Sequence, residues 1–145
     1  MRNLVLAGLI LVGSSVGAFA QQGGSNPLPE GFETKPLLKT GETRDKDPIK
    51  YPDGRPELTS VIGVIQPNGR TPLHEHPIPT FVYVLEGEVE LQTEGGSPQR
   101  YKAGGAYIES LNKKHQLHNV SGSSPARVLV IFIGEEGKAT TVAAK

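Results

Sequence analysis

The sequence has 145 residues, a formal net charge of zero at pH 7, and no cysteine. Because basic and acidic residues are equal in number and interspersed, neither nucleic acid nor an anionic membrane surface is expected as a partner. The lack of cysteine excludes disulfides, thiolate nucleophiles and cysteine metal ligands. The length suits one compact domain.

The first twenty residues are typical of a secretory signal peptide. Residues 1–3 give a short positively charged start, residues 4–12 form an apolar run, and residues 18–20 fit a cleavage site before Gln21. The apolar run is too short for a transmembrane anchor. We therefore expect an exported protein, periplasmic or secreted, without membrane contact once the signal is removed.

Residues 21–56 are expected to form a flexible leader followed by an irregular N-terminal arm, because glycine, serine and proline are frequent there. Proline has no N–H to donate, so such a segment forms at best an edge strand. Residues 35–39 are the stretch best suited to a short strand. An arm of this kind can wrap a neighbouring sheet, contact a second subunit or cross the surface.

From residue 57 onward, short apolar runs alternate with glycine, proline and asparagine, which predicts an all-β sandwich or barrel. The expected strands are residues 58–65, 81–85, 89–93, 99–101, 106–109, 115–120 and 127–133. Residues 86–88 are expected to close a hairpin, with Gly87 at a positive φ. Residues 57–134 would then form the barrel, and residues 135–145 a polar C-terminal tail.

All four histidines lie in two short segments of this predicted barrel. His74 and His76 are two residues apart on an expected strand, so their side chains share one face. His115, from a later strand, can complete a half-shell around a divalent transition metal ion such as Fe, Mn, Zn, Ni or Cu. His118 has the opposite strand parity to His115 and is expected at the surface.

The order of these residues resembles the two motifs of the cupin superfamily. Residues matching the motifs are Gly69, His74, His76 and Gly87 in the first, and Gly104, Asn112, His115 and Asn119 in the second. The resemblance covers residues 57–133 and is strongest to small exported single-domain cupins. It implies a double-stranded β-helix (jelly-roll) barrel, a metal held by three histidines and one glutamate, and a homodimer formed through N-terminal strands.

Two departures from the family pattern bear on the site. Thr80 stands where the family's glutamate ligand is expected, and Asn112 stands where the second motif has a glycine. Asparagine tolerates a left-handed backbone, so that turn can survive. Three outcomes remain open: a three-histidine metal site, a site in which Glu109 replaces the lost glutamate, or an empty site.

The sequence supports two classes of function. One is a metal-dependent enzyme acting on a small polar or anionic molecule, with dioxygenase-like chemistry first and isomerase or lyase chemistry second. In this enzyme, Glu109 or Tyr107 would move protons. The other is a non-catalytic module that binds a small ligand or a metal, because fold alone does not separate the two. Asn119 is expected to have a structural role through hydrogen bonds to the backbone.

Overall fold

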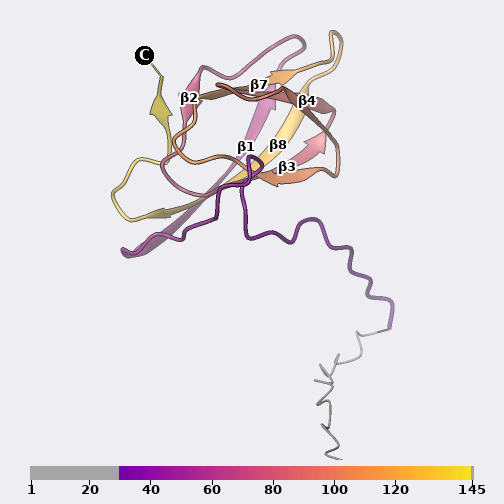
Figure 1. Ribbon diagram of the computed structural model, residues 1–145. Helices are drawn as coiled ribbons and strands as arrows, with labels where there is room; N and C mark the ends of the chain where they lie inside the picture. The colour runs from indigo at the N-terminus through magenta and orange to yellow at the C-terminus, as the bar shows by residue number, and fades with distance from the viewer. Residues whose placement is uncertain (1–29, 145) are drawn as a thin grey trace, which may run out of the picture. The chain divides into compact units, whose positions relative to one another are not determined.

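Two antiparallel β-sheets lie in two layers in the structure, a computed structural model that describes residues 30–144 (Figure 1). One sheet has four strands in the order β1-β8-β3-β6, and the other has five in the order β5-β4-β7-β2-β9. The strands are β1 (Pro56–Ile65), β2 (His74–Glu75), β3 (Thr80–Glu86), β4 (Glu88–Thr93), β5 (Gln99–Lys102), β6 (Ala106–Ile108), β7 (His115–Asn119), β8 (Ala126–Glu135) and β9 (Val142–Ala143). The predicted signal peptide and the leader through residue 29 lie outside the described residues.

The core lies between the two sheets and follows from the alternation of side chains along the strands. In β3, Val82 and Val84 are fully buried. Phe81, which points to the other face of the strand, is partly exposed. In β4 of the other sheet, Val89 and Leu91 are also fully buried. Burial of each such side chain contributes roughly 1.5–3 kcal/mol. The predicted all-β, double-stranded β-helix fold is confirmed, and residues 30–144 contain no helix that could cross a membrane.

The turn at Gly87 does not close the hairpin that we predicted. Its φ of 79° is positive as expected, but β3 pairs with β6 and β8, whereas β4 pairs with β5 and β7. The chain therefore crosses from one sheet to the other at this glycine. A Cβ here would lie 3.2 Å from Ala126, so close packing as well as φ favours glycine.

Asn119 ties the end of β7 to two loops, which agrees with its expected structural role. Its Nδ2 atom donates to the carbonyls of Ile65 at 2.9 Å and Ser124 at 2.8 Å, and its Oδ1 atom accepts from the amide of Ser121. The side chain is buried, so these bonds replace the water that the amide would otherwise need.

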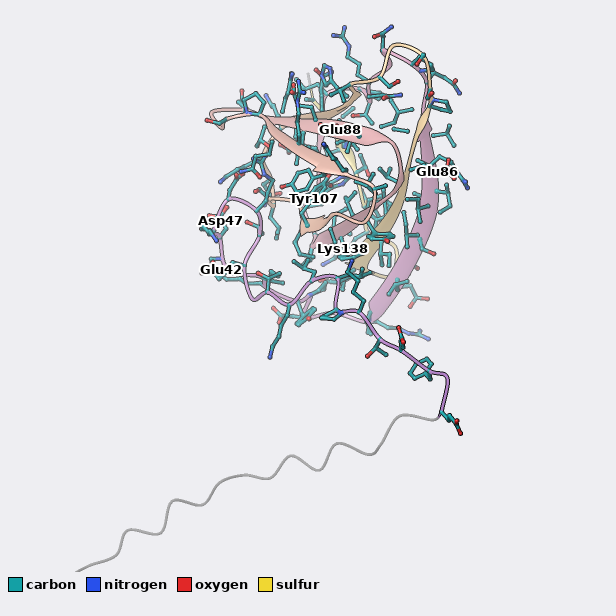
Figure 2. All side chains as sticks on the ribbon, turned by 90° about the vertical axis from the view of Figure 1, so that its right-hand side faces the viewer. Glu42, Asp47, Glu86, Glu88, Tyr107 and Lys138 are labelled. Atoms are coloured by element: carbon teal, nitrogen blue, oxygen red, sulfur yellow. The ribbon has the colours of Figure 1, made fainter. Side chains whose placement is uncertain are left out.

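The arm is irregular, and the short strand expected at residues 35–39 is absent. The proline at position 36 removes a donor, and the leucines that follow are exposed. Further along, the Arg44 amide donates to the carbonyl of Ile108, and Asp45 accepts from Ser110 at 2.6 Å. Figure 2 shows the loop that carries Glu42 and Asp47 beside the strands near Tyr107.

The segment after residue 134 is more ordered than the polar tail that we expected. Its β9 strand pairs with β2, with Val142 opposite Glu75 and Ala143 opposite His74. The Ala144 amide also donates to the carbonyl of Leu73. The tail therefore covers one edge of the five-stranded sheet beside the first two histidines.

Candidate metal centre

The imidazoles of His74, His76 and His115 converge between the two sheets. His74 in β2 pairs with His115 in β7, and their ring centroids are 4.5 Å apart. His76 follows β2, with its ring centroid 4.9 Å from that of His74 and 5.2 Å from that of His115. One ligand nitrogen of each ring lies within 4.8 Å of the other two. Three imidazoles placed in this way can bind one transition metal ion.

Each of the three rings is oriented by a backbone carbonyl at its Nδ1 atom. The pairs are His74 with Pro72 (2.7 Å), His76 with Thr140 (2.7 Å) and His115 with Lys113 (2.9 Å). Because a carbonyl oxygen only accepts hydrogen bonds, each Nδ1 carries a proton and donates it. A neutral ring of this tautomer presents the lone pair of Nε2, as metal-binding histidines commonly do.

Glu109 brings a carboxylate to the same point. It directly follows β6, and its side chain is 5% exposed. Its Oε2 atom lies 3.0 Å from Nε2 of His76 and 3.4 Å from Nε2 of His115. Burial raises the pKa of Glu109, but its contacts with His115 and His76 outweigh burial and lower the pKa to about 2. The carboxylate is therefore ionised at neutral pH.

The buried polar atoms of this cluster fit a cation. Oε2 of Glu109 and Nε2 of His115 are both buried without a hydrogen-bond partner among the described residues. With His115 neutral and its proton on Nδ1, these two atoms are both acceptors that face each other, which is unfavourable in the protein interior. In the metal-free protein a second proton, on Nε2 of His115, relieves the conflict by pairing an imidazolium with the carboxylate, in keeping with the raised pKa of His115. A divalent ion bound by both atoms removes this conflict, and a set of imidazoles with one carboxylate suits a transition metal.

The backbone explains how Glu109 reaches the position of the missing glutamate. Its amide donates to the carbonyl of Thr80 at 2.9 Å, so the two residues are neighbours on adjacent strands. Thr80 is fully buried, and its hydroxyl donates to the carbonyl of Ile78. Asn112, in the turn that leads to β7, has a φ of 53°, and so adopts the left-handed backbone expected at this glycine position.

A cavity of about 200 Å³ lies beside the cluster, between the sheets. His74, His76 and Glu109 contribute to its lining, together with Thr71 and Thr141. The rest of its wall is apolar apart from the backbone of one glycine. The cavity is partly open to solvent, because one of its lining residues, Val64 of β1, is exposed.

Tyr107, the second residue predicted to move protons, lies outside the lining of this cavity. Its ring stacks on Tyr101 with centroids 4.0 Å apart, and it packs in the core (Figure 2). Burial raises the pKa of Tyr107 well above its usual value. Its position gives no support to the predicted proton transfer. His118 lies on the opposite side of β7 from His115 and is separate from the cluster, as expected from strand parity. It is only partly exposed, and its Nε2 atom is buried, so it lies less at the surface than predicted.

Sequence analysis missed the contribution of the C-terminal segment. The carbonyl of Thr140 orients His76, and the hydroxyl of Thr141 lies 3.3 Å from the same Nδ1 atom. A backbone carbonyl leaves no trace in residue type, so no sequence signal identifies Thr140. The run of two threonines before Val142 is β-prone, but it is too short to predict a strand.

Comparisons with known proteins agree with this geometry. The sequence profile of the cupin domain matches residues 61–132. Similar solved structures include a DMSP lyase from Ruegeria pomeroyi, with 24% identity, a TM-score of 0.52, and 60% of this chain and 43% of the lyase covered. A cupin-like protein from Thermotoga maritima has 20% identity, a TM-score of 0.53, and coverage of 60% and 64%.

A third structure, an uncharacterized conserved protein with a double-stranded β-helix domain from Klebsiella pneumoniae, has 20% identity and a TM-score of 0.52. That alignment covers 67% of this chain and 90% of the other. The chain thus spans less than half of the lyase but most of this smaller protein. No curated protein sequence matches the chain. At these identities the structures share the fold.

Proposed function

Because the chain belongs to the cupin superfamily, we propose that it is a metal-dependent cupin whose ion is held by four side chains. The ligands are Nε2 of His74, His76 and His115 and a carboxylate oxygen of Glu109. In this proposal Glu109 replaces, from the neighbouring strand, the glutamate that Thr80 lacks. The centre would hold Fe, Mn, Zn, Ni or Cu.

One observation carries this proposal: three imidazoles whose ligand nitrogens lie within 4.8 Å of one another share a buried site with Glu109, whose Oε2 atom is 3.0 Å from Nε2 of His76 and 3.4 Å from Nε2 of His115. A single protonated histidine would suffice to pair with one buried carboxylate, and histidines that only packed the core would present Nε2 to apolar groups or donors. Instead, each ring is fixed at Nδ1 by a carbonyl, and two Nε2 atoms face a carboxylate. Carbonyls that orient metal-binding histidines are a usual part of such sites.

Oxygenation of a small chelating molecule is the reaction that the cavity favours. With Glu109 bound to the ion, no other aspartate, glutamate, lysine or arginine among the described residues lines the cavity. Isomerase and lyase reactions commonly need a protein acid or base for proton transfer. A redox-active ion such as Fe would supply electron transfer to O₂. The residues of the chain would bind the substrate, orient it and exclude water.

The same lack of a second acid or base supports a non-catalytic alternative, in which the barrel binds a small ligand or the metal alone. Lyase chemistry is the second enzymatic alternative, and one of the similar structures is a DMSP lyase. The substrate of that enzyme is not carried over to this chain, because the shared identity is only 24%.

Oxygen consumption by protein loaded with Fe(II) separates these alternatives. We expect small chelating acids to stimulate O₂ uptake by the wild type. His76→Ala should remove both the uptake and stoichiometric metal, while the circular dichroism spectrum stays β-rich. A loaded wild type that binds such acids but consumes no O₂ above the buffer rate would exclude oxygenation and favour the binding module.

The predictions of export and of a homodimer stay proposals. Residues 1–20 support export to the periplasm or the medium. Cells that express the full chain can be separated into periplasmic, cytoplasmic and membrane fractions. Sequencing the N-terminus of the protein in the periplasmic fraction or the medium tests cleavage before Gln21. Light scattering of the mature protein tests the homodimer.

A further inference from the structure

Resting on the proposed metal centre, we propose that the cavity takes a small monoanionic acid with one chelating end and a short apolar tail. The chelating end would lie at the histidine cluster, and the tail would lie between the sheets. This proposal names the substrate class, which the metal centre alone does not determine.

The wall away from the cluster is hydrophobic and comes from both sheets. Val82 of β3 and the side chains of Val128, Val130 and Phe132 of β8 line one side, and Leu117 of β7 lines the other. Apart from the cluster residues, the polar side chains among the described lining are two threonines: the hydroxyl of Thr141 lies beside His76, and that of Thr71 already accepts from the amide of Leu117. A substrate with polar groups along its whole length would lose hydrogen bonds to water without replacing them.

Charge restricts the occupant further. A divalent ion with three neutral imidazoles and the ionised Glu109 has a net charge of about +1. One carboxylate on the ligand neutralises this charge. No lysine or arginine among the described residues lines the cavity. The buried guanidinium of Arg44 donates to Thr93 and to the carbonyl of Ser97, and it lines a different pocket. A second carboxylate or a phosphate would therefore be buried without a partner, which is costly.

Size sets the length of the tail. The cavity measures about 200 Å³, and an apolar cavity of roughly 150 Å³ is known to hold benzene. The space thus accepts roughly six to eight non-hydrogen atoms, on the same scale. The chelating end of a 2-hydroxy acid takes about five of these atoms, which leaves a tail of roughly one to three carbons.

Calorimetric titration of Zn(II)-loaded protein with three 2-hydroxy acids tests this inference. Lactate has a methyl tail, 2-hydroxypentanoate has a propyl tail, and malate has a carboxylate in place of the end of that propyl tail. We expect 2-hydroxypentanoate to bind roughly tenfold more tightly than lactate, because two further methylenes are buried. Malate should bind more weakly than lactate. Malate binding as tightly as 2-hydroxypentanoate would overturn the proposal.

Two substitutions at Val130, which is only partly buried, provide matched variants. Val130→Phe reduces the cavity and should abolish the advantage of the propyl tail. Val130→Ala enlarges the cavity and should extend the preference to a longer tail. An unchanged ranking in both variants would contradict the assignment of the tail to this cavity.

Metal content, measured on the same samples, separates this inference from the function on which it rests. Wild-type protein that retains no zinc after reconstitution would refute the proposed metal centre and the inference with it. Protein that retains one equivalent of zinc but shows no preference among the three acids would refute the inference alone.

Discussion

Replacing Glu109 by glutamine should destabilise the metal-free protein at pH 6 by roughly 3 kcal/mol. The carboxylate is buried against His76 and His115, and its pKa is lowered from 4.5 to about 2. Each pKa unit corresponds to about 1.4 kcal/mol between the ionised and neutral forms. Since glutamine approximates the neutral acid in shape and charge, the variant loses about this difference.

The loss of stability in Glu109→Gln should depend on pH, and the direction of that dependence follows from the pKa shifts of Glu109 and His115. The lowered pKa of Glu109 gives stability that is present above pH 4.5 and is lost as the pH falls toward 2. Burial lowers the pKa of His115, but Glu109 outweighs burial and raises it above 6.5. The stability from His115 is therefore complete below pH 6.5 and is lost as the pH rises through its folded pKa. The pair stabilises the metal-free fold most between pH 4.5 and 6.5.

Urea unfolding of the wild type and of Glu109→Gln, both in chelator, measures this difference. We expect a large gap in unfolding free energy at pH 6 and a smaller gap at pH 8. Glu88→Gln is a suitable control, because Glu88 is partly exposed and, among the described residues, its one ion pair is a long contact of 3.9 Å with Lys102. A gap of the same size at both pH values, or no gap at pH 6, would refute the charge interaction that we describe.

Three further predictions concern the metal and the scaffold. His76→Ala should take up less than a tenth of an equivalent of zinc by plasma mass spectrometry yet keep a β-rich spectrum, and full uptake would exclude His76 as a ligand. Truncation after Gly137 removes β9 and the Thr140 carbonyl that orients His76. Metal affinity, measured by competition with a chelator, should therefore fall about 10–100-fold. Unchanged affinity would show that the carbonyl is dispensable. Asn119→Ala leaves the carbonyls of Ile65 and Ser124 without this donor and the Ser121 amide without its acceptor, and it should lower the unfolding free energy by roughly 2–4 kcal/mol. The comparison variant His118→Gln should change it by less than about 1 kcal/mol. Equal effects would contradict the bridging role of Asn119.

The strands and the histidine cluster could be predicted because each depends on short-range pattern. Alternating apolar residues identify β3 and β4, and the spacing of His74 and His76 places both rings on one side of the chain. Strand parity also separates His115 from His118. These features need no knowledge of which strands pair.

Features that depend on pairing could not be predicted in this way. Gly87 signals a turn, but not that the next strand joins the other sheet. Glu109 lies beside Thr80 only because β6 pairs with β3, which no local pattern reveals. Tyr107 has the same parity as Glu109, yet it packs against Tyr101 rather than lining the cavity, because position along the barrel matters as well as face.

A crystal structure of the zinc-loaded protein, with anomalous scattering measured at the zinc edge, tests the four-residue centre most directly. We predict one ion bonded to Nε2 of His74, His76 and His115 at about 2.0–2.1 Å and to a Glu109 oxygen at about 2.0–2.2 Å. An ion bound by the three histidines with Glu109 turned away, or an ion at another place in the fold, would contradict the account.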